Sequence, residues 1–201
     1  ALLGHLEKVN YHFDTGILAT PLLLQVLTEN GRADLAYKLM NQRDFPSYGY
    51  LADKKNNTLW ETWNGDGNDE GCGHCHPMFG SVVAWFYHSL AGIKPDQSDP
   101  GMKHFYIEPM IVPDLKYCRA TYDSQYGKIS SDWKIDENGN LNLKIEVPAN
   151  TSATVIIPDW GGRTVLESGK PVSEVSNIVI DKVDSARMKV SSGVYHFVIL
   201  K

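Results

Sequence analysis

The residues best suited to chemistry gather in one stretch of the chain, Asn56 to Val83. Trp60 and Trp63 flank Glu61, and His76 follows after a loop rich in glycine and aspartate. Aromatic rings stack on the apolar faces of pyranoses, carboxylates act as acids or bases, and a neutral histidine hydrogen-bonds ring hydroxyls. This combination of residue types indicates a site that binds and cleaves a sugar. A structural explanation is also open, in which the W-E-T-W run is a strand with both indoles in the core and Glu61 at the surface.

The loop between Glu61 and His76 allows a second interpretation. Cys72, Cys75 and His76 fit the C-x-x-C-H signature of c-type haem attachment, and with His74 they place two cysteines and two histidines within five residues, a set that could bind zinc. A structural zinc site usually takes two separated ligand pairs, and the remaining cysteine is the lone Cys118. We therefore expect no cofactor and no metal, with haem or metal binding kept as the alternative.

Composition restricts the class of protein. The 201 residues are 42% hydrophobic and 21% charged, as in an ordinary soluble globular chain. The net charge of -5 argues against nucleic acid as a partner, and no apolar run has the length of a membrane span. Three cysteines do not fix the compartment, so the sequence leaves a periplasmic, secreted or cytoplasmic location open.

The first hundred residues have the periodicity of helical hairpins. Apolar spacing predicts helices within Leu18–Thr28, Asp34–Gln42 and Pro77–Ala91, and Asn30-Gly31 is expected to end the first. The segment Phe45–Tyr50 is expected to break the helical pattern. Two or three helices cannot enclose a core, so they are expected to belong to a larger helical assembly.

The pattern changes to period two after a turn-rich connection at Lys94–Gly101. Asn138-Gly139 is typical of a hairpin turn between two of the strands, which together predict an antiparallel sandwich. The fold class is thus α+β in two parts, with residues 1–100 as one domain and 101–201 as the other. The predicted strands are His104–Ile111, Cys118–Ser124, Gly127–Asp136, Asn140–Pro148, Ala153–Ile157, Asn177–Ile180 and Gly193–Leu200.

Several blocks of the chain, in one order, resemble the C-terminal end of the bacterial α-L-rhamnosidases of glycoside hydrolase family 78. The blocks cover nearly the whole length. They are DTGILAT at Asp14–Thr20, LTENGRADLAYKLM at Leu27–Met40, FPSYGY at Phe45–Tyr50, TLWETWNG at Thr58–Gly65, HPMFGSVVAWFYHSLAGI at His76–Ile93, PGMKHFYIEP at Pro100–Pro109, YDSQYGKISSDW at Tyr122–Trp133 and VPANTSATVIIP at Val147–Pro158. The resemblance implies the end of an (α/α)6 barrel followed by a C-terminal β-sandwich.

The resemblance also implies roles for individual residues. Glu61, in the W-E-x-W motif, would be the general base of an inverting hydrolysis that removes terminal α-L-rhamnose from glycosides. His76 would lie in the rhamnose pocket, with Trp60 and Trp63 as its walls. The general acid of this family lies upstream, in the earlier half of the barrel, so the remainder of the barrel is an implied partner. This chain by itself is therefore expected to be inactive.

The chain departs from the family pattern between Glu61 and His76. The loop is shorter than the resemblance implies and carries Cys72 and Cys75, where an asparagine often precedes the histidine. The departure affects the contacts on the aglycone side of the site. Three hypotheses follow: the C-terminal portion of a rhamnosidase, a carbohydrate-binding module without catalysis, and a haem or metal protein.

Overall fold

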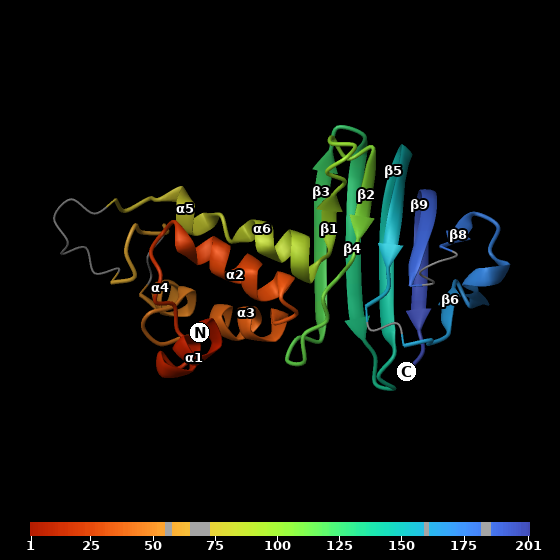
Figure 1. Ribbon diagram of the computed structural model, residues 1–201. Helices are drawn as coiled ribbons and strands as arrows, with labels where there is room; N and C mark the ends of the chain where they lie inside the picture. The colour runs from red at the N-terminus through yellow and green to blue at the C-terminus, as the bar shows by residue number, and fades with distance from the viewer. Residues whose placement is uncertain (55–57, 65–72, 159–160, 182–185) are drawn as a thin grey trace. The chain divides into compact units, whose positions relative to one another are not determined.

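The chain forms two compact units, Ala1–Trp85 and Phe86–Lys201. The computed structural model describes residues 1–54, 58–64, 73–158, 161–181 and 186–201. Unit 1 is helical and unit 2 is built on a β-sheet, so the α+β class predicted from the sequence is confirmed (Figure 1). Among the described residues, every helix is too short or too polar to cross a bilayer.

The centre of unit 1 is a helical hairpin. Leu24 and Leu27 of one helix are buried, as are Leu35 and Leu39 of the next, because both helices place apolar residues three and four positions apart. Gly31 takes a φ of 72° between them, as a glycine does after a helix end, which confirms the predicted stop. The helices of this unit are α1 (Leu2–Lys8), α2 (Ala19–Glu29), α3 (Ala33–Met40), α4 (Tyr48–Asp53), α5 (Pro77–Gly80) and α6 (Val83–Trp85).

Two predictions for the helical unit differ from the structure, and one helix was not predicted. The segment Phe45–Tyr50 follows the end of α3, as predicted, but it also begins a new helix, α4. Ser47 caps that helix by accepting a hydrogen bond from the Tyr50 amide at 3.0 Å. The short helix α1 was not predicted, since it has no capping side chain. The helix predicted over Pro77–Ala91 is interrupted after Gly80, where the amides of Ser81, Ala84 and Trp85 bond to carbonyls three residues back. It ends as a π-helix at Phe86–Leu90.

Unit 2 contains one hydrogen-bonded sheet whose strands run through a bend. The strands are β1 (Ile93–Pro95), β2 (His104–Ile107), β3 (Tyr117–Ser124), β4 (Gly127–Ile135), β5 (Leu141–Ile156), β6 (Val165–Glu167), β7 (Lys170–Pro171), β8 (Ile178–Ile180) and β9 (Arg187–Ile199), with a 3₁₀ turn at Val172–Glu174. Most strand pairs are antiparallel, as predicted, and the exception is the parallel pair of β2 and β5. The β4–β5 hairpin turns at Gly139, whose φ is 82°, which confirms the predicted turn.

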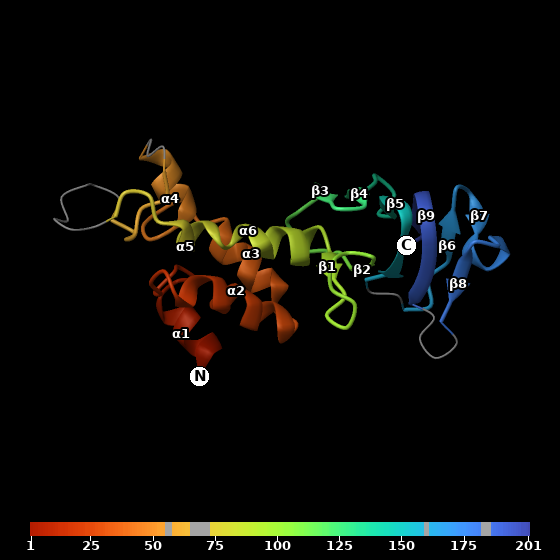
Figure 2. The same cartoon turned by 90° about the horizontal axis from the view of Figure 1, so that it is seen from above.

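The two layers of the sandwich share the long strands β5 and β9. Residues 141–146 of β5 pair with β4, whereas residues 152–155 pair with β2. The register between β5 and β9 shifts between Val147 and Ser152, so the predicted strands 140–148 and 153–157 are one bent strand. Figure 2 shows the consequence: β3 and β4 lie apart from β1 and β2, and both pairs meet at β5.

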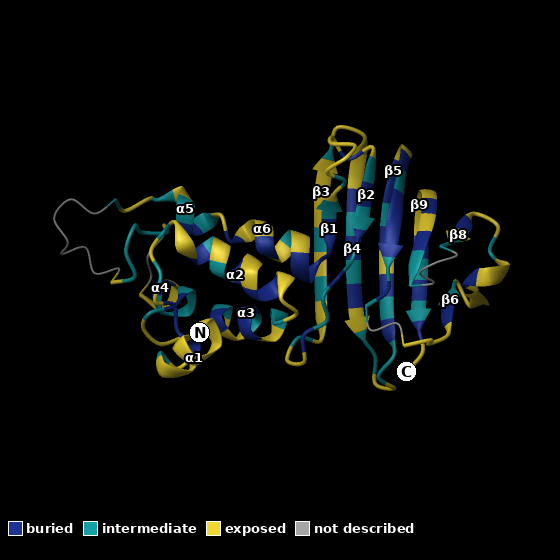
Figure 3. Ribbon diagram, in the orientation of Figure 1, coloured by how far each residue is buried: buried dark blue, intermediate teal, exposed yellow. Residues whose placement is uncertain are grey.

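The core of unit 2 lies between these layers. Along much of β4 and β9, buried residues alternate with partly or fully exposed ones, which Figure 3 shows as blue bands between teal or yellow ones. Trp133, Leu143 and Phe197 come from one layer, and Phe105 and Val155 come from the other, and all five are fully buried. The sandwich therefore has an ordinary hydrophobic core, and its outer faces are free to carry polar residues.

Candidate active site

Glu61 lies where two segments of unit 1 run side by side. The Glu61 amide donates to the carbonyl of Gly73 at 2.9 Å, and the His76 amide donates to the carbonyl of Leu59 at 2.7 Å. The region around Glu61 is a series of bends, so the structure does not support the alternative of a strand through W-E-T-W. These hydrogen bonds fix the two ends of the loop that joins Glu61 to His76.

One carboxylate oxygen of Glu61 is held by the backbone. The Gly73 amide donates to Oε2 at 2.9 Å. Within the described part of the chain, the other oxygen, Oε1, has no hydrogen-bond partner. The carboxyl group is therefore oriented through one oxygen, while the other can accept a proton or a hydrogen bond from a bound molecule.

His76 lies beside the same glycine and precedes α5. A Cβ placed on Gly73 would lie 3.2 Å from Oε2 of Glu61 and 3.9 Å from Cδ2 of His76, so both side chains border this residue. Nδ1 of His76 is buried and has no hydrogen-bond partner among the described residues. A buried polar atom without a partner costs about 1–3 kcal/mol, a cost that a bound hydroxyl or water would remove.

Trp63 packs inward. Its indole stacks on Phe13 at 5.1 Å between ring centroids, contacts Phe79 at 4.3 Å, and meets the edge of Tyr48 at 5.2 Å. Its Nε1 donates to the carbonyl of Thr15 at 2.7 Å. Trp63 thus joins an aromatic cluster with Phe13, Tyr48 and Phe79, and its role as a pocket wall stays a prediction.

Tyr48 fastens that aromatic cluster to α5. Its hydroxyl donates to the carbonyl of Phe79 at 2.9 Å, and Phe79 is fully buried. Burial raises the pKa of Tyr48, so the phenol stays neutral and remains a donor. The FPSYGY block therefore helps to hold the W-E-T-W segment, a role that sequence analysis did not assign.

Trp60 lies differently from Trp63. Its indole is half-buried and stacks on the exposed ring of His74, with 4.1 Å between centroids and 13° between planes. Both indoles are half-buried, but Trp60 packs on an exposed ring whereas Trp63 packs on the buried Phe13 and Phe79. The role of Trp60 as a wall of the pocket also stays a prediction. Two residues of the same type, three positions apart, thus have different ring neighbours.

Gly73 is the residue of the site that sequence analysis missed. Its amide holds Glu61 and its missing side chain leaves room beside Oε2. A glycine next to a candidate catalytic loop was the available signal, since glycine permits close approach of backbone to other groups.

Part of the loop falls outside the described residues. This applies to Asp66, Asp69, Glu70 and Cys72, so the C-x-x-C-H motif is not described as a whole. Cys75 is an exposed free thiol. Among the residues that are described, no three histidine, cysteine or acidic side chains come close enough to hold a metal ion.

Comparison with known proteins covers both units. Residues 1–90 match the model of the bacterial α-L-rhamnosidase six-hairpin glycosidase domain, and residues 92–171 match that of the bacterial α-L-rhamnosidase C-terminal domain. An α-L-rhamnosidase of Streptomyces avermitilis is 39% identical over 163 residues, which are 78% of this chain and 16% of the relative. One from Formosa agariphila is 32% identical over 204 residues, which are 98% of this chain and 22% of the relative.

Solved structures agree with the sequence matches. The α-L-rhamnosidase from Dictyoglumus thermophilum has a TM-score of 0.85 and 34% identity, with 98% of this chain and 22% of that chain covered. The Streptomyces avermitilis α-L-rhamnosidase complexed with L-rhamnose has a TM-score of 0.82 and 33% identity, covering 98% of this chain and 19% of that one. This chain spans about a fifth of the length of these relatives, and it belongs to the bacterial α-L-rhamnosidase family, whose C-terminal portion it matches.

Proposed function

We propose that this chain contributes the C-terminal part of an α-L-rhamnosidase, a glycosidase that removes terminal α-L-rhamnose from rhamnose-containing glycosides. The observation that carries the proposal is the convergence of Glu61 and His76 on Gly73, inside the segment that matches the glycosidase domain. The names of the relatives, and a relative's structure with bound L-rhamnose, support the same substrate class.

Glu61 is proposed as the general base of an inverting hydrolysis. Its ionised carboxylate takes a proton from a water molecule while the water oxygen forms a bond to the anomeric carbon. The bond between that carbon and the leaving-group oxygen breaks, and the leaving oxygen takes a proton from a general acid. In an inverting enzyme the two carboxyl groups stand roughly 6.5–9.5 Å apart, which leaves room for the water.

The general acid is proposed to come from a part of the glycosidase barrel that this chain does not include. The resemblance places that residue upstream of the W-E-x-W motif, and the chain spans only 16% to 22% of the length of its curated relatives. The remainder of the barrel is therefore proposed as the functional partner of unit 1.

His76 is proposed to bind a sugar hydroxyl through Nδ1. That atom is buried without a partner among the described residues, and it lies beside the glycine that orients Glu61. A hydroxyl of rhamnose can donate to or accept from an imidazole nitrogen, so bound sugar would satisfy the atom and fix the ring relative to the base. Trp60 and Trp63 are proposed as walls of the rhamnose pocket. Trp63 would have this role in addition to its packing on Phe13 and Phe79.

The decisive experiment compares Glu61→Gln with His76→Ala in the protein that carries the complete glycosidase domain. Glu61→Gln keeps the size and hydrogen bonding of the side chain and removes its basicity, so kcat on an aryl α-L-rhamnoside should fall by about 10²–10⁴-fold or more with little change in KM. His76→Ala should raise KM more than it lowers kcat.

Glu7→Gln, on the exposed surface of α1, is the matched control and should leave both constants unchanged. The melting temperature of each variant shows whether it is folded. A folded Glu61→Gln protein with the kcat of the wild type would refute the assignment of the base. Rhamnose binding without any turnover in the wild-type protein would instead favour a binding module.

A further inference from the structure

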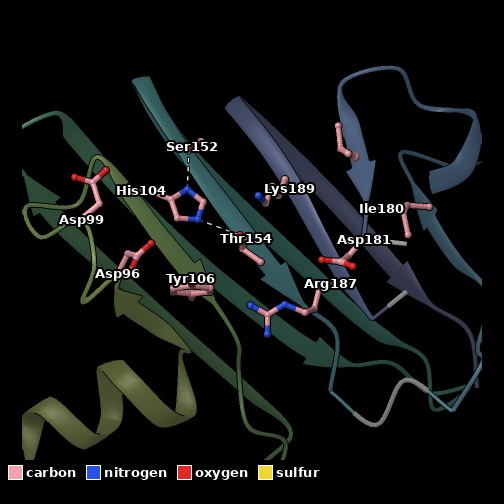
Figure 4. Close-up of a pocket in the computed structure, with 11 residues that line it drawn as sticks. Asp96, Asp99, His104, Tyr106, Ser152, Thr154, Ile180, Asp181, Arg187 and Lys189 are labelled. Carbon is pink, nitrogen blue, oxygen red and sulfur yellow. Dashed lines mark hydrogen bonds between the residues drawn. The ribbon is translucent and has the colours of Figure 1, made fainter. Parts of the chain in front are cut away.

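A groove of about 690 Å³ lies on the outer face of unit 2, and all of its lining residues belong to that unit. It crosses the strands β2, β5, β8 and β9 (Figure 4). The alternation of the strands explains its lining: Phe105, Ala153 and Met188 are buried in the core, so their neighbours along each strand face outward. These outward residues are mostly polar, as expected for a surface in contact with solvent.

His104 forms the fixed floor of the groove. Its Nδ1 lies 2.8 Å from the hydroxyl of Ser152 and its Nε2 lies 3.0 Å from the hydroxyl of Thr154, both on β5. The edge of its ring meets Tyr106, with 5.6 Å between centroids. Both ring nitrogens are engaged, so the imidazole cannot turn, and the two hydroxyls keep further capacity for hydrogen bonds.

Two side chains of β9, Arg187 and Lys189, supply hydrogen-bond donors to the groove. The Arg187 guanidinium lies 5.8 Å from the centre of the Tyr106 ring, and Figure 4 shows it extending toward that ring. Contact with an aromatic ring favours one position of a guanidinium and leaves its N–H groups in the plane for other partners. Lys189 lies two residues along the same strand. Neither Arg187 nor Lys189 has a carboxylate partner in the described part of the chain.

Acceptors balance these donors. Asp96 and Asp99 line the groove from the loop after β1, and Asp181 lines it from the segment after β8. Three carboxylates against two cations give the lining a formal net charge of only -1, with the histidine neutral. A strongly anionic ligand would be repelled by the carboxylates, and a cationic ligand by Arg187 and Lys189. A ligand that donates and accepts hydrogen bonds without carrying charge fits a lining that holds both kinds of group.

We propose that this groove binds a neutral oligosaccharide. Hydroxyls on adjacent carbons of a sugar ring donate to carboxylates and accept from Arg187 and Lys189. Tyr106 and Val179 supply apolar surface for the C–H face of the sugar ring, and Val179 is 64% exposed. The volume is in the range of small-molecule sites, so it accommodates a short oligosaccharide. Glu61 is not among the residues that line the groove, so binding there does not depend on the proposed catalytic function.

The test is calorimetric titration of the 201-residue chain with neutral trisaccharides of different configuration, namely cellotriose and α-1,4-galactotriose. Trigalacturonate is the matched charged probe, because it differs from galactotriose by carrying carboxylates at C6. We expect saturable binding of at least one neutral trisaccharide and at least tenfold weaker binding of trigalacturonate than of galactotriose.

Variants assign the binding to the groove. Arg187→Ala and Lys189→Ala should each weaken binding of the neutral sugar by about tenfold, and Asp96→Asn together with Asp99→Asn should weaken it by a similar factor. Arg163→Ala and Lys134→Ala remove exposed cations outside the groove and should have no effect. Glu61→Gln should also leave this binding unchanged.

Several outcomes would overturn the inference. One is the absence of saturable binding for both neutral trisaccharides at millimolar concentration. Another is binding that persists unchanged in the folded Arg187→Ala and Lys189→Ala proteins. A third is tighter binding of trigalacturonate that is lost in the same variants, because that result would make the groove an anion site.

Discussion

His12 shows at the scale of one residue how a buried ionisable group is stabilised in unit 1. Its Nδ1 faces the carbonyls of Val9 and Asn10 at 3.2 and 2.9 Å, and its Nε2 lies 2.7 Å from Oδ1 of Asp44. All of these partners are acceptors, so the geometry favours the imidazolium. Burial alone would lower the pKa of His12, but the hydrogen bond and charge of Asp44, with the two carbonyls, raise it above 6.5.

This pair predicts how the stability of unit 1 depends on pH. Because the folded pKa of His12 is raised, its contribution is complete below pH about 6.5 and is lost as pH rises through the folded pKa. The hydrogen bond from His12 lowers the pKa of Asp44 below 3.8, so that carboxylate contributes above pH about 4 and less as pH falls through its folded pKa. Melting temperatures should therefore be highest between pH about 4 and 6.5.

Asp44→Asn should flatten this dependence on the alkaline side, because it removes the charge that stabilises the imidazolium. Asp53→Asn is the matched control, since Asp53 pairs with an arginine, Arg43, and not with a histidine. An alkaline decline in melting temperature that is the same in Asp44→Asn as in the wild type would contradict the role of the pair.

At the scale of an element, strand β4 closes the end of the π-helical segment Phe86–Leu90. The last carbonyls of a helix have no partner within it. Trp133 Nε1 donates to the carbonyl of Leu90 at 2.7 Å, and the Ser131 hydroxyl donates to that of Ala91 at 2.7 Å. Both side chains are fully buried because they lie on the same face of β4. The strand thus supplies polar groups where the helical segment needs them.

We expect Ser131→Ala to lower the free energy of unfolding of unit 2 by about 1–3 kcal/mol, because it leaves a buried carbonyl without this donor. Ser130→Ala, one residue away and on the opposite face of β4, should change it by less than about 0.5 kcal/mol. Urea unfolding of the two variants measures the difference. Equal effects would show that the buried hydrogen bond does not matter to stability.

At the scale of the whole chain, unit 1 exposes apolar residues that its own helices do not cover. Leu18, Leu22 and Val26 are 69%, 59% and 44% exposed. Leu27, which the spacing groups with this face, is instead buried, because α2 is apolar on more than one side and packs one of them on α3. An exposed row of this kind is typical of a surface that another segment covers.

We therefore expect the 201-residue chain alone to show no hydrolysis of an aryl α-L-rhamnoside, whereas a longer protein with the complete glycosidase domain does. The physical reason is that leaving-group departure needs a general acid as well as a base. Turnover by the short chain that Glu61→Gln abolishes would contradict this and would place the acid within it, with Asp66, Asp69 and Glu70 as candidates.

The division into domains 1–100 and 101–201 is kept as a proposal, and it can be tested with two segments. Residues 86–201 include β1, which pairs with β2, and the carbonyls that Ser131 and Trp133 bind. A segment that starts at residue 101 lacks all of these. If the contacts matter, the longer segment should melt at a higher temperature, while both should show β structure by circular dichroism. Equal melting temperatures would support a boundary at residue 100.

The sequence by itself determined the features that depend on local pattern. Helical spacing predicted α2 and α3, alternation predicted most strands, and Asn138-Gly139 predicted the β4–β5 turn. The motif blocks, in their order along the chain, identified the family without any information on tertiary contacts. These features depend on neighbouring residues, so they can be read along the chain.

Only the tertiary structure decided which residues meet across the chain. Trp60 and Trp63 have the same type and nearly the same position, yet one stacks on His74 and the other packs on Phe13. The parallel pairing of β2 with β5, and the groove that it creates around His104, join residues about fifty positions apart. Such contacts depend on how separated segments pack into a core, and local periodicity carries no information about that choice.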